Sequence, residues 1–238
     1  MQGASFPRLR LVMMRGCPIL EQLQLEEALL RADQGNWCLI NQGSPPAIVM
    51  GISGKPELLI NQPLFQNRPV PLIRRFSGGG TVFVDEHTYF VTLICNRQEV
   101  NVSCCPQRIL NWTAELYRSA FPVGFHLMEN DYVLGDKKFG GNAQYLSKDR
   151  WLHHTSLLWD YNPAHMEYLL FPPKTPRYRG QRNHREFLCR LCDHHADKKL
   201  LETKLVQALA RFFIIEEVPL AHAATALRRP HRKAACMV

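Results

Sequence analysis

The chain combines three stretches of helical periodicity with many short apolar runs. Apolar residues recur every three to four positions over residues 18–31, 106–120 and 198–213, which predicts amphipathic helices. Runs rich in β-branched and aromatic residues predict strands at residues 9–13, 37–40, 47–50, 70–73, 81–84, 89–95, 132–134, 142–146 and 155–159. Residues 172–180, which include three prolines, predict a loop. The pattern indicates a domain that mixes strands with helices.

Length and composition favour one well-cored domain, since 46% of the 238 residues are hydrophobic. No apolar run reaches the roughly 18 to 20 residues that span a bilayer, so we expect no membrane partner. The eight cysteines lack the spacing of a small secreted framework, which favours free thiols in a reducing compartment. We expect the cytoplasm. The mitochondrial matrix is the alternative, because Arg8, Arg10 and Arg15 precede any acidic residue, as in an organelle leader.

The formal net charge of +8 is concentrated in two segments. Residues 174–199 carry eight basic and three acidic residues, and residues 219–238 carry four basic residues and no acidic one. A local basic surface favours an acidic partner or a charged ligand. No aromatic and basic platform indicates a nucleic-acid partner. A solvated basic face with a disordered tail is the alternative reading of these charges.

A glycine-rich stretch, RRFSGGGTVFVD, runs from Arg74 to Asp85 between two predicted strands. Three consecutive glycines cost backbone entropy, so they indicate positive φ angles or close approach of the backbone to another group. Successive N–H groups in such a loop bind an anion, most often phosphate. Arg74 and Arg75 can supply charge, and Ser77 can donate a hydrogen bond. An ordinary glycine turn is the alternative, and neither a Walker loop nor a dinucleotide fingerprint is present.

A second candidate motif is GDKKFGGNAQ, residues 135–144. Neighbouring side chains on a strand point to opposite faces, so one of Lys137 and Lys138 faces inward. An inward lysine is costly unless it meets an anion, and the two glycines that follow leave room for one. A basic β-turn is the alternative.

Histidines and cysteines form no recognisable metal site. His153 and His154 are neighbours on a predicted strand, so their side chains diverge. Cys189 and Cys192, with the histidines that follow them, supply only half of a zinc-binding pattern. We therefore predict no protein-bound metal.

Taken together, the motifs resemble the catalytic domain of lipoate-protein ligases, within the wider biotin and lipoate ligase fold. The resemblance covers about residues 9–218. RRFSGGGTVFVD at residues 74–85 is similar to the family's RRxSGGGxVxxD, residues 130–131 to its ND, residues 136–143 to its DxKxxGxA, and residues 153–158 to its HHGTLL. It implies an α+β fold, a central mixed β-sheet flanked by helices, with a catalytic domain over residues 1–218. Residues 219–238 would be a basic, disordered tail.

The resemblance also implies roles for individual residues, with Lys138 as the catalytic lysine. Residues expected to bind ATP are Arg75, Gly80, Thr81, Val82, Phe83 and Lys138. Residues expected to bind lipoate are Ser77, Gly78, Gly79, Lys138, Gly141 and His154. Residues expected to support the site are Arg74, Asp85, Asn130, Asp131 and Asp136. Mg2+ is expected to arrive with ATP.

The activity implied has two steps: lipoate and ATP give lipoyl-adenylate and pyrophosphate, and a lysine of an acceptor protein then displaces AMP. Acceptors would be the lipoyl domains of 2-oxoacid dehydrogenase E2 subunits or the glycine cleavage H protein. Residues 174–199 would form the docking surface for such an acidic domain, through Arg179, Arg182 and Arg185. An apolar tunnel with a carboxylate site suits lipoate and octanoate alike.

Two departures from the family pattern open alternatives. Thr155 stands where the family usually has glycine, and the residues that match contain no accessory domain, so a separate subunit is expected to supply it. Lipoyl or octanoyl transfer from a preactivated donor is one alternative, and a non-catalytic module that binds lipoyl domains is another. An octanoyltransferase with a cysteine nucleophile is disfavoured, because Leu152 occupies the nucleophile's position. The glycine- and arginine-rich loop of biotin ligases is absent.

Overall fold

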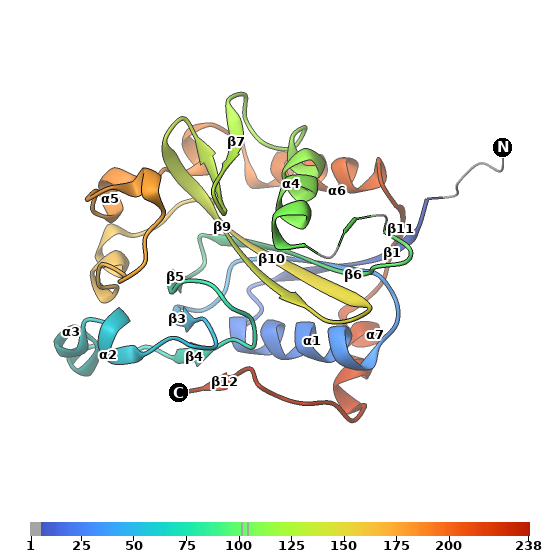
Figure 1. The fold of residues 1–238 in the computed structure, drawn as a ribbon, viewed down its shortest axis with the longest axis horizontal. Helices are drawn as coiled ribbons and strands as arrows, with labels where there is room; N and C mark the ends of the chain where they lie inside the picture. The colour runs from blue at the N-terminus through green and yellow to red at the C-terminus, as the bar shows by residue number, and fades with distance from the viewer. Residues whose placement is uncertain (1–5, 101, 104) are drawn as a thin grey trace.

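Two β-sheets with helices packed on them form the protein (Figure 1). The computed structural model describes residues 6–100, 102, 103 and 105–238. The larger sheet contains β1 (Arg8–Arg15), β2 (Trp37–Gln42), β6 (Thr88–Asn96), β7 (Phe125–Met128), β8 (Asp131–Leu134), β9 (Lys137–Leu146), β10 (Arg150–Leu158) and β11 (Ile214–Glu217). In space their order is β11-β1-β2-β6-β10-β9-β8-β7. No helix in this part of the chain is long and apolar enough to cross a membrane.

The larger sheet is mixed, as predicted. Strand β1 is parallel to both of its neighbours, β2 and β11. From β2 to β7 every pairing is antiparallel. The long strand β10 pairs with β6 on one side and β9 on the other, which fixes the position of the histidine motif in the middle of the sheet.

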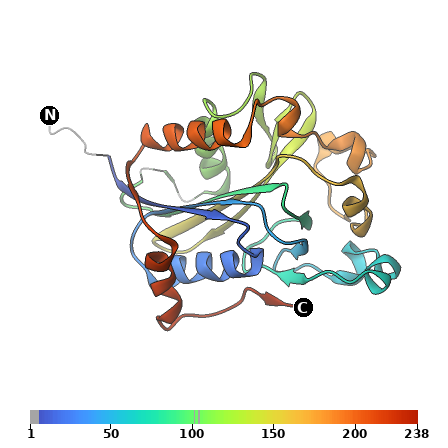
Figure 2. The same cartoon turned by 180° about the vertical axis from the view of Figure 1, so that it is seen from behind.

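Helices cover both faces of the larger sheet (Figures 1 and 2). Helix α1 (Ile19–Ala32) and the short α7 (Leu220–Ala224) lie on one face, and α4 (Pro106–Tyr117) and α6 (Lys198–Ala210) lie on the other. Because strand side chains alternate between faces, Leu11 packs into the core beneath α4 and α6, whereas its neighbour Val12 packs against α1. The sheet therefore has a hydrophobic core on each side.

The smaller sheet carries the glycine-rich stretch. Its strands are β3 (Ala47–Met50), β4 (Leu72–Arg74), β5 (Val82–Val84) and β12 (Cys236–Met237), in the order β12-β4-β3-β5. A third core lies between this sheet and short helical segments. These segments are α2 (Pro56–Leu59), α3 (Gln62–Asn67), α5 (His184–Phe187), η1 (Pro163–Tyr168) and η2 (Arg177–Arg179). The short η3 (Leu191–Asp193) instead packs into the core beneath α4 and α6. The glycine-rich stretch connects β4 to β5.

The structure contains a strand or helix at each position where the hydrophobic pattern predicted one. The largest differences are at β9 and β10, which begin earlier than predicted, at Lys137 and at Arg150. The extension of β9 includes Gly140 and Gly141, which read as turn residues but pair with Leu157 and Ser156 in the sheet. Elements β7, β11, α2, α3 and α5 were not predicted, because each has only four to six residues and no clear period.

The carboxyl-terminal segment differs from the predicted disordered tail. After α7 the chain forms η4 (Thr225–Arg228) and then β12, which pairs antiparallel with β4. The backbone N–H groups of Ala234 and Ala235 donate to the buried carboxylate of Glu27 at 2.7 and 3.0 Å. Ala226 and Ala235 belong to the core beneath α1. Small apolar residues and backbone hydrogen bonds hold this segment, and the basic composition gave no indication of them.

Candidate functional site

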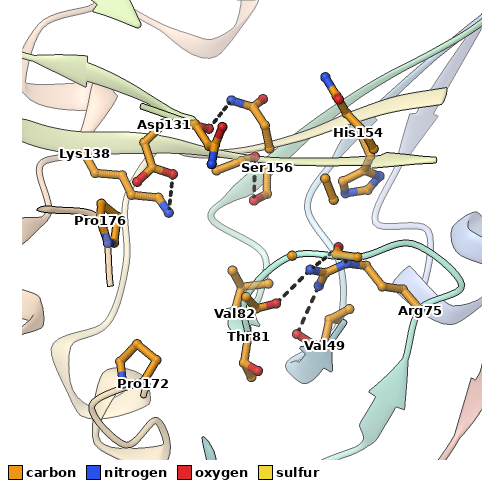
Figure 3. A pocket seen from close by; sticks show the side chains of 18 of the residues that line it. Val49, Arg75, Thr81, Val82, Asp131, Lys138, His154, Ser156, Pro172 and Pro176 are labelled. Atoms are coloured by element: carbon orange, nitrogen blue, oxygen red, sulfur yellow. Dashed lines mark hydrogen bonds and ion pairs between the residues drawn. The ribbon is translucent and has the colours of Figure 1, made fainter. Parts of the chain in front are cut away.

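A cavity of about 600 Å³ is lined by residues of both sheets. Its walls come from the glycine-rich stretch, from β9 and β10, and from the loop segment between η1 and α5. In Figure 3, Arg75 and His154 lie on one side of the cavity, and Lys138, Pro172 and Pro176 lie on the other. The three motifs recognised in the sequence therefore meet in one place.

Most of the predicted site residues line this cavity. They are Arg75, Gly78, Gly79, Gly80, Thr81, Val82, Asn130, Asp131, Lys138, Gly141 and His154. The others, Arg74, Ser77, Phe83, Asp85 and Asp136, lie outside its wall.

Three of the residues outside the cavity wall make contacts that stabilise the structure behind it. Ser77 is buried, and its carbonyl accepts a hydrogen bond from Ile52 N at 3.0 Å. Phe83 stacks on the ring of His165 with centroids 4.3 Å apart. The carboxylate of Asp85 lies 2.8 Å from Nδ1 of the same histidine. The structure thus places Ser77 and Phe83 behind the surface that a substrate would touch.

Arg75 clamps the glycine-rich stretch from inside. Its guanidinium is buried and donates to the carbonyl of Gly78 at 2.9 Å and to that of Gly80 at 2.7 Å. Gly79 between them has a φ of 104°, and a Cβ there would lie 2.6 Å from Nη2 of Arg75. Only glycine fits this backbone position. Arg75 therefore sets the conformation of the loop, a role that the sequence did not indicate.

The clamp leaves the backbone donors of the loop available. Within the described residues, no protein acceptor takes the N–H groups of Gly78, Gly79 or Gly80. The three glycines are exposed and line the cavity. Free N–H groups next to one another form a concavity suited to an oxyanion. This geometry favours the anion cradle over the ordinary turn.

Burial lowers the pKa of Arg75 to about 10, and the nearby carboxylate of Glu26 opposes that shift. The guanidinium is therefore still charged at neutral pH. Its positive charge lies directly beneath the exposed glycines. The loop combines backbone donors with a buried cation, which strengthens its attraction for anions.

Lys138 is the inward lysine of the pair on β9, whereas Lys137 is exposed. Its Nζ lies 2.8 Å from Oδ1 of Asp131, which is on β8. The other carboxylate oxygen of Asp131 accepts a hydrogen bond from the hydroxyl of Tyr178 at 2.9 Å. A Cβ on Gly141 would lie 3.3 Å from Lys138 Nζ, so glycine leaves the space beside the ammonium open.

His154 is oriented by a buried carboxylate from α1. Its Nδ1 lies 3.0 Å from Oε1 of Glu26, which is fully buried. Glu26 also accepts hydrogen bonds from Gln22 at 2.8 Å and from Thr92 at 2.7 Å. The sequence analysis missed this network. Its signal was present, because Gln22 and Glu26 are polar residues four positions apart on the apolar face of a helix.

His153 points to the other face of the sheet, as predicted for neighbours on a strand. Its Nε2 lies 3.2 Å from the hydroxyl of Tyr132 and 3.3 Å from that of Thr113, and Gln144 contacts its Nδ1. Burial, and secondarily the charge of His154, lowers the pKa of His153 to about 3. This histidine is a neutral core residue.

The described residues contain no group of three or more His, Cys, Asp or Glu side chains placed to hold a metal ion. The half zinc pattern does not assemble, since Cys189 Sγ contacts the carbonyl of Lys137, whereas His195 contacts the carbonyl of Ala120. All seven cysteines in this part of the chain are free thiols, and Cys104 lies outside the described residues.

Thr155, which departs from the family pattern, and Leu152, at the position of the octanoyltransferase nucleophile, are both buried. Thr155 donates a hydrogen bond to the side chain of Asn142 at 2.8 Å, so it links β10 to β9 next to the cavity. Leu152 is fully buried in the core beneath α1. No cysteine among the described residues lines the cavity. A covalent mechanism through a thiol at that position is therefore unsupported.

The prediction that residues 174–199 present three arginines on a docking surface is wrong for Arg179. Arg179 is only 4% exposed, and its guanidinium contacts the rings of Phe171 and Phe187. Arg182 pairs with Asp136 at 2.7 Å. Arg185 is exposed. Arg179 is buried by aromatic residues that come before and after it in the sequence. The prediction counted only the charges of residues 174–199 and did not consider these aromatic residues.

Solved structures show what fold these two sheets define. A bi-partite lipoate protein ligase of Thermoplasma acidophilum, solved in a study that includes its E2 lipoyl domain, superposes with a TM-score of 0.72 at 15% identity, over 93% of this chain and 91% of that one. A lipoate-protein ligase A bound with ATP superposes with a TM-score of 0.71 at 16% identity, over 94% of this chain and 93% of that one. The fold is that of these lipoate-protein ligases, a mixed sheet flanked by helices.

The chain belongs to the lipoyl protein ligase A/B catalytic domain family, whose sequence model matches residues 18–214. A curated relative, inactive lipoate–protein ligase 2 of Plasmodium falciparum, is 28% identical over 239 aligned positions. That alignment covers 74% of this chain and 62% of the relative, so the chain spans less than two thirds of the relative's length.

Proposed function

We propose that this protein activates lipoate with ATP to form lipoyl-adenylate and then transfers the lipoyl group to a lysine of a lipoyl domain. The observation that carries this proposal is the position of Lys138. Its ammonium reaches into the cavity 2.8 Å from Asp131, on the side opposite Arg75 and His154. An anion bound across the cavity would meet a cation at one end and backbone N–H groups at the other.

The acyl chain would occupy the apolar part of the cavity. Ile19 and Leu23 of α1, with Val49 and Phe90 from the two sheets, line that part. These side chains offer no hydrogen bonds, so they suit the hydrocarbon and disulfide portion of lipoate. Octanoate fits the same surface.

In the first step a carboxylate oxygen of lipoate would attack the α-phosphorus of ATP. A new O–P bond forms, and the bond to pyrophosphate breaks. Lys138 and the loop N–H groups would stabilise the negative charge on the α-phosphoryl oxygens. Magnesium bound to the triphosphate would neutralise part of the remaining charge.

In the second step the neutral amine of the acceptor lysine would attack the acyl carbonyl carbon. The bond between that carbon and the phosphate oxygen breaks, AMP leaves, and the amine loses one proton to solvent. E2 lipoyl domains and the glycine cleavage H protein are the proposed acceptors. A reducing compartment, the cytoplasm or the mitochondrial matrix, would keep the free thiols reduced.

Transfer from a lipoyl-adenylate made elsewhere is the second candidate. The Plasmodium falciparum relative carries the name inactive, which favours this reading. A separate accessory subunit would then complete the activating enzyme. The bi-partite Thermoplasma acidophilum ligase, whose name describes such an arrangement, gives a precedent for a ligase in two parts.

Pyrophosphate release from ATP and lipoate tests the proposal, with Lys138→Ala as the variant and Lys137→Ala as the matched control. We expect release by the wild type and by the Lys137 variant, and a loss of roughly 100-fold or more for Lys138→Ala. Equal release by Lys138→Ala would reject the role of Lys138. If the wild type releases no pyrophosphate but transfers lipoyl from synthetic lipoyl-adenylate, the second candidate holds. If it does neither but binds a lipoyl domain, the protein is a binding module.

A further inference from the structure

Arg179 is a buried cation whose guanidinium lacks an ion-pair partner. Its Nε donates to the carbonyl of Arg182 at 3.0 Å, while its buried Nη2 has no hydrogen-bond partner. Among the described residues, no carboxylate forms an ion pair with Arg179 within 4.0 Å. A buried, unpaired charge is costly, so an arginine in this environment indicates a ligand that supplies the missing negative charge.

The nearest acidic side chain is committed to other groups. Asp131 influences Arg179 electrostatically, but its two oxygens contact Lys138 Nζ at 2.8 Å and the Tyr178 hydroxyl at 2.9 Å. Two aromatic rings, Phe171 at 4.6 Å and Phe187 at 4.8 Å, stabilise the guanidinium through its faces. The rings supply no hydrogen-bond acceptor, so Nη2 is left to hydrogen-bond with a ligand.

Arg179 lines the same cavity as Lys138, together with Lys174 and His184 from the same loop segment. Figure 3 places Pro172 and Pro176 of this segment on the Lys138 side, away from Arg75 and His154. Burial, with the charges of Arg179 and Lys138, lowers the pKa of His184 to about 4, so its neutral ring can donate one hydrogen bond. This corner of the cavity carries the cations Lys138, Lys174 and Arg179 together with the carboxylates of Glu129 and Asp131. Helix α1 lines the cavity with the apolar side chains of Ile19 and Leu23.

The geometry of phosphoryl transfer indicates which part of the substrate would lie in this corner. Phosphoryl transfer places the attacking and leaving oxygens roughly in line on opposite sides of the phosphorus. If the acyl chain lies along α1 and the α-phosphate lies beside Lys138, the leaving group extends toward Pro172 and Pro176. A planar guanidinium with a free edge can bind two phosphate oxygens at once.

We propose that Arg179 binds the β- and γ-phosphoryl groups of ATP and stabilises pyrophosphate as the leaving group. This inference rests on the proposed function, in which ATP is cleaved between its α- and β-phosphates. When that P–O bond breaks, its electron pair goes to the departing pyrophosphate, and the added negative charge develops next to the guanidinium. Arg179 is thus a substrate-binding residue of the cavity, and not part of a surface for docking other proteins.

Calorimetric binding of inorganic pyrophosphate and of AMP tests the assignment. The variant is Arg179→Met, which keeps the length and apolar stem of the side chain and removes the charge. The control is Arg185→Met, the same change at an exposed arginine of the same segment. We expect Arg179→Met to weaken pyrophosphate binding roughly tenfold to hundredfold, which is the effect of losing charge-assisted hydrogen bonds. AMP binding by this variant, and both affinities of Arg185→Met, should change less than about threefold.

Thermal unfolding separates ligand binding from a structural role. Without ligand, Arg179→Met should unfold at the same temperature as the wild type or higher, because a methionine removes an unpaired buried charge. Pyrophosphate should raise the unfolding temperature of the wild type and not that of the variant. A variant that loses pyrophosphate binding together with its fold would show that Arg179 is structural, and would overturn the proposal.

Three further results decide the assignment. Unchanged pyrophosphate affinity in Arg179→Met, or no pyrophosphate binding by the wild type, rejects the subsite. An equal loss of AMP and pyrophosphate affinity assigns Arg179 to the α-phosphate instead. Pyrophosphate binding that depends on Arg179, in a wild type that releases none from ATP and lipoate, keeps the subsite and rejects only the proposed activity.

Discussion

Asp131 holds Lys138 and Tyr178 with one carboxylate group, its Oδ1 at 2.8 Å from the ammonium and its Oδ2 at 2.9 Å from the hydroxyl. The lysine comes from β9, and the tyrosine comes from η2, in the loop segment that lies on the same side of the cavity as Lys138. One buried carboxylate therefore positions the reactive ammonium and also anchors a wall of the site. Its removal should affect both.

Asp131→Asn should reduce adenylate formation by roughly tenfold to hundredfold, because the ammonium loses a charged acceptor that fixes its position. Asp136→Asn is the matched control, since Asp136 is exposed on the same hairpin and lies outside the cavity wall. Pyrophosphate release at saturating ATP and lipoate measures the effect. Equal rates for the two variants would show that Asp131 does not position Lys138.

Gly79→Ala should disrupt the glycine-rich loop, while Gly78→Ala should leave it intact. Gly79 has a φ of 104°, and its Cβ would meet Arg75 Nη2 at 2.6 Å, whereas a Cβ on Gly78 would meet nothing within 4 Å. We expect Gly79→Ala to cost about 1 to 3 kcal/mol of unfolding free energy and to abolish binding of ATP. Urea unfolding and ATP calorimetry measure the two effects. Similar results at both glycines would contradict the clamp geometry.

Glu26→Ala should destabilise the protein by about 3 to 5 kcal/mol, because it leaves the buried groups of Gln22, Thr92 and His154 without their shared acceptor. Glu21→Ala is the control, an exposed glutamate on the same helix. Urea unfolding at neutral pH gives the free-energy difference. A loss below about 1 kcal/mol for Glu26→Ala would show that water replaces the carboxylate.

His153 should make the protein acid-labile. Its folded pKa is about 3, and an unfolded histidine titrates near 6.5. Between these values only the unfolded chain binds the proton, so stability falls as the pH decreases, by up to about 1.4 kcal/mol per pH unit.

Urea unfolding at about pH 7 and about pH 5 tests whether the free energy of unfolding falls as the pH decreases. The stability lost between the two pH values should be smaller in His153→Gln than in the wild type by up to about 2 kcal/mol. His194→Gln, at an exposed position, is the control. A wild type and a His153 variant that lose the same stability would show that His153 does not cause the acid lability.

The sequence predicted the larger elements because their side chains follow one period over many residues. Helix α1 shows the 3.6-residue pattern over its length, and β6 is rich in β-branched and aromatic residues and is buried along almost all of its length, because helices cover both faces of its sheet. Strand β9 was shortened in the prediction, since Gly140 reads as a turn. In the structure a Cβ at Gly140 would lie 3.0 Å from the side chain of Tyr132, so close packing between strands accounts for this glycine.

The sequence allowed us to predict the site residues that lie in or next to a glycine motif. It did not allow us to predict the site residues that come from the loop segment between η1 and α5. Lys138 could be placed by strand alternation and family resemblance. Tyr178 and Arg179 could not, because residues 172–180 have no period from which their contacts with the flanking Phe171 and Phe187 could be predicted. Glu26 is the intermediate case, a charged residue on an apolar helix face whose partner His154 is far away in the sequence.

The parallel pairing of β1 with β11 has a consequence for the order in which the chain can fold. Arg8 pairs with Ile214 and Leu11 with Glu217, so the outer edge of β1 pairs with a strand that is synthesised much later than β1. During synthesis β1 can pair with β2 alone, and its other edge presents unpaired N–H and C=O groups to neighbouring chains. Chaperone binding before release from the ribosome would shield that edge, and we expect the yield of native protein to depend on it.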